Sequence, residues 1–136
     1  MKSLILISAG IILIFSEDCG TSKMITKKDY ALGTKITSTV GSTMLSYVSA
    51  KTDIYNSSEL NKGTKEEFVY AGISGNTIKI EYRQYYIYNG EWYIEDGFPL
   101  HLEYDLSLGD SITCRYYRIW ILSADNNEIK FMVIKD

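Results

Sequence analysis

Two cysteines are the first residues of this chain whose type and position could support chemistry. Cys19 follows an apolar run and two acids, and it is a candidate for lipid attachment or for a disulfide with Cys114. A bridge is feasible in an oxidising compartment, but the spacing does not decide whether it forms. Cys114 shares its strand parity with Ile112 and Tyr116, so the alternative is a buried thiol in the core.

The sequence around Cys19 carries arguments for and against lipidation. Bacterial lipoprotein signals place a small residue directly before the modified cysteine, whereas this chain has Asp18 there and Glu17 before it. Two carboxylates are costly to place in a protease site at the membrane. In favour, Cys19 lies at a typical signal length and a polar stretch follows it. Ordinary cleavage after Ser16 is the competing alternative.

Aromatic side chains are concentrated in one predicted hairpin, residues 77–95, which we call the aromatic hairpin. Tyr alone accounts for 12 of the 136 residues of the chain. Exposed rings can stack on sugars, bases or a partner's side chains, and Tyr and Trp are common in binding hot spots. Cross-strand aromatic pairs also stabilise hairpins without a ligand, so both roles stay open. The candidate binding residues are Tyr85, Tyr86, Tyr88, Trp92 and Tyr93.

The sequence contains no recognisable set of catalytic or metal-binding residues. His101, Glu103 and Asp105 alternate on one predicted strand, but the chain has a single His and no Asp-rich calcium loop. Nucleophile and phosphate-loop motifs are missing. The acids, Glu91, Asp96 and Glu103 among them, are scattered, which leaves a hydrolase as a distant third hypothesis. We therefore predict a protein that is not an enzyme and uses no cofactor or metal.

The N-terminus has the layout of a secretory signal peptide. Met1 and Lys2 precede an apolar run over residues 4–15, and charge follows at once. As a helix this run would span roughly 18 Å, short of the ~30 Å hydrocarbon core of a membrane. We expect a signal helix over residues 1–16, or 1–18 if Cys19 is lipidated. A tether over residues 17–33 and one β domain over residues 34–136 would follow.

Beyond the tether, apolar and polar residues alternate as in half-buried strands. Asn89 and Gly90 suit a type I′ hairpin turn. Residues 52–64 form the longest predicted loop, and a switch of apolar parity between Tyr116 and Tyr117 predicts a β-bulge. The fold class is all-β: a small antiparallel β-sandwich or partly open barrel of about seven to eight strands. The predicted strands cover residues 34–40, 43–51, 67–73, 77–88, 91–95, 100–106, 111–123 and 128–135.

Three short segments share a Gly, polar, Thr or Ser, apolar pattern. They start at Gly41, Gly75 and Gly109, so that successive copies lie 34 residues apart. The spacing is compatible with a repeat, but the same pattern is common at any junction between a turn and a strand. Because the flanking residues match only weakly, we interpret the three segments as strand starts.

Four segments carry a resemblance to a known class of proteins. They are residues 40–44 (VGSTM), 70–85 (YAGISGNTIKIEYRQY), 102–106 (LEYDL) and 119–134 (IWILSADNNEIKFMVI). Together they resemble small uncharacterised exported lipoproteins of Gram-negative bacteria, which carry a signal, a Cys and one β domain. The resemblance implies an envelope location and brings no activity and no catalytic residues. The two acids before Cys19 depart from the pattern of that class.

Charge and composition narrow the classes of partner. The formal net charge is −3, and the 14 basic residues are scattered, so no footprint for nucleic acid is present. The favoured function is a non-enzymatic periplasmic or membrane-anchored β domain that binds a protein or envelope surface component through the aromatic hairpin. Membrane association would depend on a lipid at Cys19. The alternative is a carrier of small apolar ligands with an internal cavity.

Overall fold

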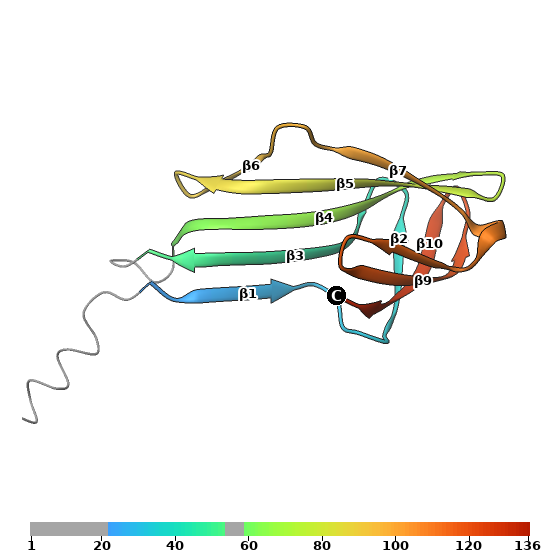
Figure 1. Cartoon of the computed structure of the whole chain (residues 1–136), viewed down its shortest axis with the longest axis horizontal. Coiled ribbons are helices and arrows are strands. Elements are labelled where there is room, and N and C mark those ends of the chain that lie inside the picture. Colours follow the sequence, from blue (N-terminus) through green and yellow to red (C-terminus); the bar gives the residue numbers. More distant parts are fainter. Residues whose placement is uncertain (1–21, 54–58) are drawn as a thin grey trace, which may run out of the picture.

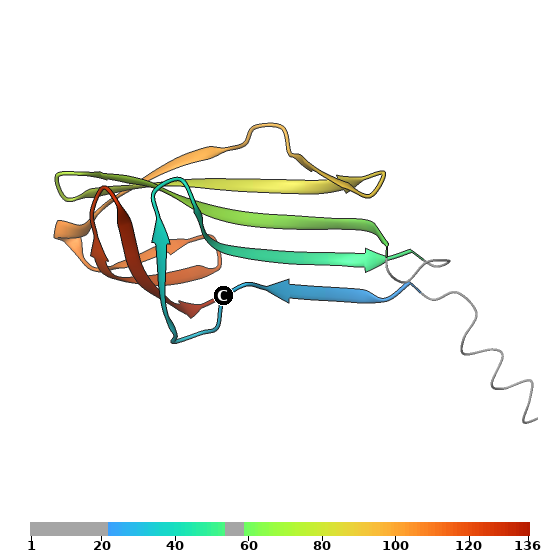
Figure 2. The same ribbon diagram turned by 180° about the vertical axis from the view of Figure 1, so that it is seen from behind.

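The computed structural model describes residues 22–53 and 59–136, which form two antiparallel sheets (Figures 1 and 2). The predicted signal helix and Cys19 lie outside the described residues. Sheet A contains, in order of pairing, β1 (Met24–Lys28), β3 (Thr43–Thr52), β4 (Leu60–Ser74) and β5 (Thr77–Tyr88), with β6 (Glu91–Ile94) and β7 (Leu100–Asp105) both paired to β5. Sheet B contains β2 (Lys35–Thr39), β10 (Glu128–Lys135), β9 (Tyr117–Ala124) and β8 (Ser111–Cys114). A short 3-10 turn, η1 (Leu106–Leu108), joins the sheets.

The hydrophobic core lies between the two sheets, which confirms the predicted all-β sandwich. Alternation along each strand sends one set of side chains inward, and burial of each large apolar side chain contributes about 1.5–3 kcal/mol. The residues at the centre of this core are Leu45, Phe68, Tyr70, Ile78, Ile80, Tyr82, Ile119, Ile129, Phe131 and Val133.

Sheet B covers only part of sheet A. In Figures 1 and 2, β2, β9 and β10 cross one end of β3, β4 and β5, whereas the other end of these strands continues past them together with β1 and β6. We call this other end the projecting half; it comprises β1, β6 and residues 47–52, 60–66 and 84–88. Its inner face is the one that continues the core-facing side of sheet A, with the parity of Phe68 and Tyr82.

Turn residues place the strands as predicted. Gly41, Gly75 and Gly109 all have positive φ, and a strand begins two residues after each. Asn89 and Gly90 have φ values of 51° and 77° and close the hairpin between β5 and β6. The three segments are therefore strand starts, and each glycine has a backbone conformation that would be strained in a residue with a side chain.

Two segments predicted to lack regular structure form strands instead. Residues 24–28, placed in the tether, form β1, which pairs along its length with β3. The described part of the predicted long loop, from Leu60 onward, forms the first half of β4. Both segments are mostly polar beyond Met24, Ile25 and Leu60, and neither shows apolar alternation, because they lie in the projecting half, where no second sheet imposes a buried face.

The predicted β-bulge at Tyr116 is wrong. Residues 111–123 form two strands, β8 and β9, which pair with each other through Cys114 and Tyr117 across a tight turn. Arg115 in this turn has a φ of 53°, and Tyr116 is 73% exposed. A tight turn shifts the apolar parity by one residue just as a bulge does, so the pattern alone did not separate them.

Candidate binding site

The side chain of Glu66 links the two sheets at the edge of the core. Its Oε1 accepts a hydrogen bond from the Tyr82 hydroxyl at 2.6 Å, and its Oε2 accepts one from the Tyr117 hydroxyl at 2.7 Å. Arg115 Nη1 lies 3.2 Å from Oε1, donates to Gln84 Oε1 at 2.8 Å and also contacts the Tyr82 hydroxyl. Burial raises the pKa values of both tyrosines, and the bonds to Glu66 raise them further. The phenols therefore act as neutral donors to a carboxylate.

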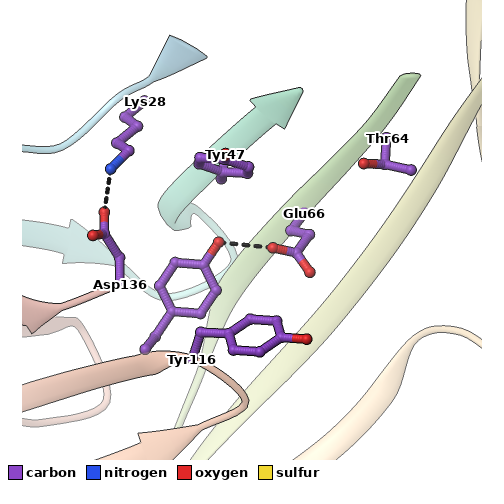
Figure 3. A pocket seen from close by; sticks show the side chains of 7 residues that line it. Lys28, Tyr47, Thr64, Glu66, Tyr116 and Asp136 are labelled. Carbon is purple, nitrogen blue, oxygen red and sulfur yellow. Dashed lines mark hydrogen bonds and ion pairs between the residues drawn. The ribbon is translucent and has the colours of Figure 1, made fainter. Parts of the chain in front are cut away.

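A pocket of about 500 Å³ opens where sheet B ends over the inner face of sheet A, and we call it the step pocket (Figure 3). β1, β3 and β4 form one side of it, and the β8–β9 turn and the end of β10 form the other. It is lined by Lys28, Tyr47, Thr64, Glu66, Tyr116, Tyr117 and Asp136.

The ion pair between Lys28 and Asp136 closes one end of the step pocket. Lys28 Nζ lies 2.5 Å from Asp136 Oδ2, which also accepts a bond from the Tyr30 hydroxyl at 2.8 Å. These two donors lower the pKa of Asp136. The same ammonium group lies 5.8 Å from the centre of the Tyr47 ring, within cation–π distance. Lys28 is therefore held between a carboxylate and aromatic rings.

Tyr116 is the most exposed aromatic residue around the step pocket. The positive φ of Arg115 turns the chain so that Tyr117 enters the core and Tyr116 does not. In Figure 3 the Tyr116 ring is drawn below Glu66, and both residues line the pocket. A large ring left 73% exposed beside a hollow is available to a ligand.

The structure divides the five candidate residues of the aromatic hairpin between two faces. Tyr86, Tyr88 and Tyr93 lie on the inner face of the projecting half and are exposed by 45%, 61% and 42%. Tyr86 and Tyr93 stack with ring centres 6.0 Å apart, and Tyr88 meets Tyr93 edge to face at 6.4 Å. Tyr86 is also the cross-strand partner of Thr64, which lines the step pocket. These three tyrosines and the step pocket therefore share one continuous face.

Tyr85 and Trp92 lie on the opposite face. The Tyr85 hydroxyl donates to Glu67 at 2.9 Å, and Lys65 lies 4.3 Å from the Tyr85 ring centre and 5.9 Å from that of Trp92. Lys65 also pairs with Glu67 at 2.9 Å. Side chains of the protein itself already contact both rings. Because Tyr85 and Trp92 lie on the opposite face, they do not belong to one site with Tyr86, Tyr88 and Tyr93.

The predicted cysteine site is described only in part. Cys114 is buried with its parity partner Ile112, and burial raises the pKa of its thiol. Cys19 lies outside the described residues, so its lipidation and its disulfide with Cys114 stay predictions. His101, Glu103 and Asp105 are exposed on β7, and no cluster of potential metal ligands is found within residues 22–53 and 59–136.

Sequence reasoning missed most residues of the step pocket. Glu66 has the parity of Phe68 and Tyr70, so a carboxylate on a core-facing position was a signal that could have been followed. The parity switch at Tyr116 was a second signal. The sequence contained no signal for Lys28 or Asp136, because their ion pair depends on how β1 and β10 are placed relative to each other in the fold.

Comparisons with known proteins add no family to this geometry: no family model, curated protein or solved structure matches the chain. The resemblance to exported lipoproteins therefore stays a prediction. Within the described part of the chain, no helix is long and apolar enough to cross a membrane.

Proposed function

We propose that this protein is a non-enzymatic cell-envelope domain that binds an envelope component on the inner face of its projecting half. The observation that carries the proposal is the exposure of Tyr86, Tyr88 and Tyr93 on the face that also holds the step pocket. Covering an exposed aromatic ring with a partner removes apolar surface from water, which is favourable. Tyr is also one of the residues enriched in the energetically important centres of binding interfaces.

The bonding of the acids at the step pocket favours binding over catalysis. Glu66 accepts hydrogen bonds from Tyr82 and Tyr117, and Asp136 accepts them from Lys28 and Tyr30. The bonds from Lys28 and Tyr30 lower the pKa of the Asp136 carboxyl, which makes it a poor general acid, and both oxygens of Glu66 are already engaged by protein donors. The carrier hypothesis has no comparable support, because large side chains such as Phe68 and Phe131 fill the space between the sheets.

Site-specific photo-crosslinking in the producing cell tests the proposal. A photoreactive phenylalanine at Thr64, on the inner face, should give a crosslinked species, whereas one at the exposed Thr37 on the outer side of sheet B should not. Adding Tyr86→Ala and Tyr93→Ala should abolish the Thr64 product without unfolding the domain. A Thr64 product unchanged by these substitutions would contradict binding on this face.

The envelope location is inferred from the apolar run over residues 4–15 and the charged residues after it. Intact mass of the protein from its native membrane and periplasmic fractions tests this inference. A cut after Ser16 or an acylated Cys19 would each agree with export. An uncut chain recovered from the cytosol would exclude it.

A further inference from the structure

We propose that the ligand of this face is a neutral oligosaccharide, with one terminal sugar in the step pocket and the following units along Tyr86, Tyr93 and Tyr88. This inference rests on the proposed function and adds the chemical class of the ligand. Three features of the site carry it: its charge, its ring faces and its shape.

The charges of the step pocket are paired within the protein. Lys28 is bonded to Asp136 at 2.5 Å, and Glu66 is bonded to Arg115 at 3.2 Å. Among the described residues that line the pocket, each charged side chain thus already has a partner of opposite charge. A charged ligand would have to break one of these pairs, whereas a neutral ligand leaves them intact.

The groups that remain accessible match a sugar ring. Tyr47, Thr64 and Tyr116 each line the pocket with a hydroxyl for which the structure gives no hydrogen bond within the described residues. A pyranose carries hydroxyls around its rim and C–H groups on its faces. The hydroxyls can bond to these three side chains, while a C–H face packs on the Tyr116 ring.

The site is elongated, which favours a chain of sugars over a single one. Thr64 at the pocket is directly opposite Tyr86 on β5, Tyr86 stacks on Tyr93, and Tyr93 meets Tyr88. Tyr93 lies beside Tyr86 on β6, and Tyr88 lies two residues further along β5, so the rings form a short, kinked row toward the end of the aromatic hairpin. The rings partly cover one another, and the exposed remainder of each is the surface that successive sugar units would contact.

An extended peptide fits this face less well. A peptide added to a sheet binds mainly through backbone hydrogen bonds at a free strand edge. Most of the inner face lies on β3, β4 and β5, whose backbone groups are paired with neighbouring strands on both sides, and the edge strands β1 and β6 form its margins. These three strands present side chains there: aromatic rings and hydroxyls around the step pocket and Tyr86, and the exposed Lys51 and Lys62 further along β3 and β4.

Calorimetric titration of the protein purified from its native envelope fraction tests the inference. The probes are cellohexaose, maltohexaose and N-acetylchitohexaose, each with its disaccharide, and heparin hexasaccharide and decaproline serve as charged and peptide controls. We expect at least one neutral hexasaccharide to bind more tightly than its disaccharide and than both controls. A preference for heparin or for decaproline would overturn the inference.

Substitutions then locate the ligand. Tyr116→Ala should weaken binding of both the hexasaccharide and its disaccharide roughly tenfold, the loss expected for one stacked ring. Tyr88→Ala, at the far end of the row, should weaken the hexasaccharide and leave the disaccharide unchanged. Trp120→Ala removes an exposed ring from the outer face of sheet B, and it should change neither affinity. Equal effects of Tyr116→Ala and Trp120→Ala would overturn the assignment.

The two proposals fail in different ways. If no neutral oligosaccharide binds but the Thr64 crosslink still depends on Tyr86 and Tyr93, the ligand class is wrong and the binding face stands. If the crosslink is independent of both tyrosines and no sugar binds, both proposals are wrong.

Discussion

At the scale of single residues, Glu66 connects the two sheets through its side chain. It lies on β4 of sheet A and accepts hydrogen bonds from Tyr82 on β5 and Tyr117 on β9 of sheet B. Both tyrosines are almost fully buried, at 1% and 3% exposure. Removal of the carboxylate would take the acceptor from the Tyr117 hydroxyl and would leave the Tyr82 hydroxyl only the longer contact to Gln84 Oε1, at 3.4 Å.

We therefore expect Glu66→Ala to lower the free energy of unfolding by about 1–3 kcal/mol, the cost of unpaired buried polar groups. Urea unfolding at neutral pH measures the loss. The matched control is Glu103→Ala, which removes an exposed carboxylate from β7 and should change stability by less than about 0.5 kcal/mol. Equal midpoints for the two variants would show that the Glu66 contacts contribute nothing.

Because of the same two tyrosines, we expect the stability of the folded protein to fall at alkaline pH. Burial raises the pKa values of Tyr82 and Tyr117 above the ordinary value of 10.0, so the folded protein holds these protons more tightly than the unfolded chain does. Their contribution to stability is therefore complete below about pH 10 and is lost as the pH rises above it. Thermal unfolding should show this loss as the pH is raised from about 10 upward.

Tyr117→Phe provides the control for that titration. Without one of the two buried phenols, the variant should lose less of its melting temperature over the same pH range than the unchanged protein. Ionisation of all tyrosines at the ordinary pKa in a protein that stays folded, followed by ultraviolet absorbance, would contradict the prediction.

At the scale of elements, β3 and β4 approach each other closely at Gly63. A Cβ atom at this position would lie 2.5 Å from the Ala50 Cβ and 2.6 Å from the Ser49 carbonyl oxygen. Gly63→Ala should therefore destabilise the protein by about 1–3 kcal/mol through overpacking between the strands. Chemical unfolding measures this effect, with Lys62→Ala on the same strand as a control. A Gly63→Ala variant as stable as the control would show that the strands separate at no cost.

Elements with a buried face could be predicted from the sequence, and elements without one could not. β5 alternates because Ile78, Ile80 and Tyr82 face the core, and its turn follows from Asn89 and Gly90. β1 has only Ile25 partly buried, so its identity depends on pairing with β3. A local pattern cannot record a neighbour that is distant in sequence.

The same limit applies to the candidate site. Period-two alternation explains why the aromatic residues of the hairpin divide between two faces. The partners of Tyr116 and Lys28 in the step pocket come from strands far away in the chain. Their proximity follows from the place where sheet B ends, which no local pattern specifies.

At the scale of the whole molecule, one half of sheet A packs against sheet B and the projecting half does not. Residues 68–70 of β4 are buried beneath sheet B, whereas residues 49–51 of β3 lie in the projecting half. Fewer buried apolar contacts lower the free energy of local opening. Amide hydrogen exchange should therefore be faster at residues 49–51 than at residues 68–70, although both segments are paired on two sides. Equal protection would mean that sheet A opens as one unit.

The pairing of β2 with β10 has a consequence for the order in which the chain folds. Ser38 is opposite Ile129, so sheet B joins a strand near the start of the described chain to one at its end. Contacts between such distant residues form late, because a long loop must close first, and they slow folding. The hairpin of β4 and β5 can form as soon as its residues are synthesised. We expect that, during synthesis from the N-terminus, β2 stays unpaired until β10 has been made. Only then can sheet B be completed over the core.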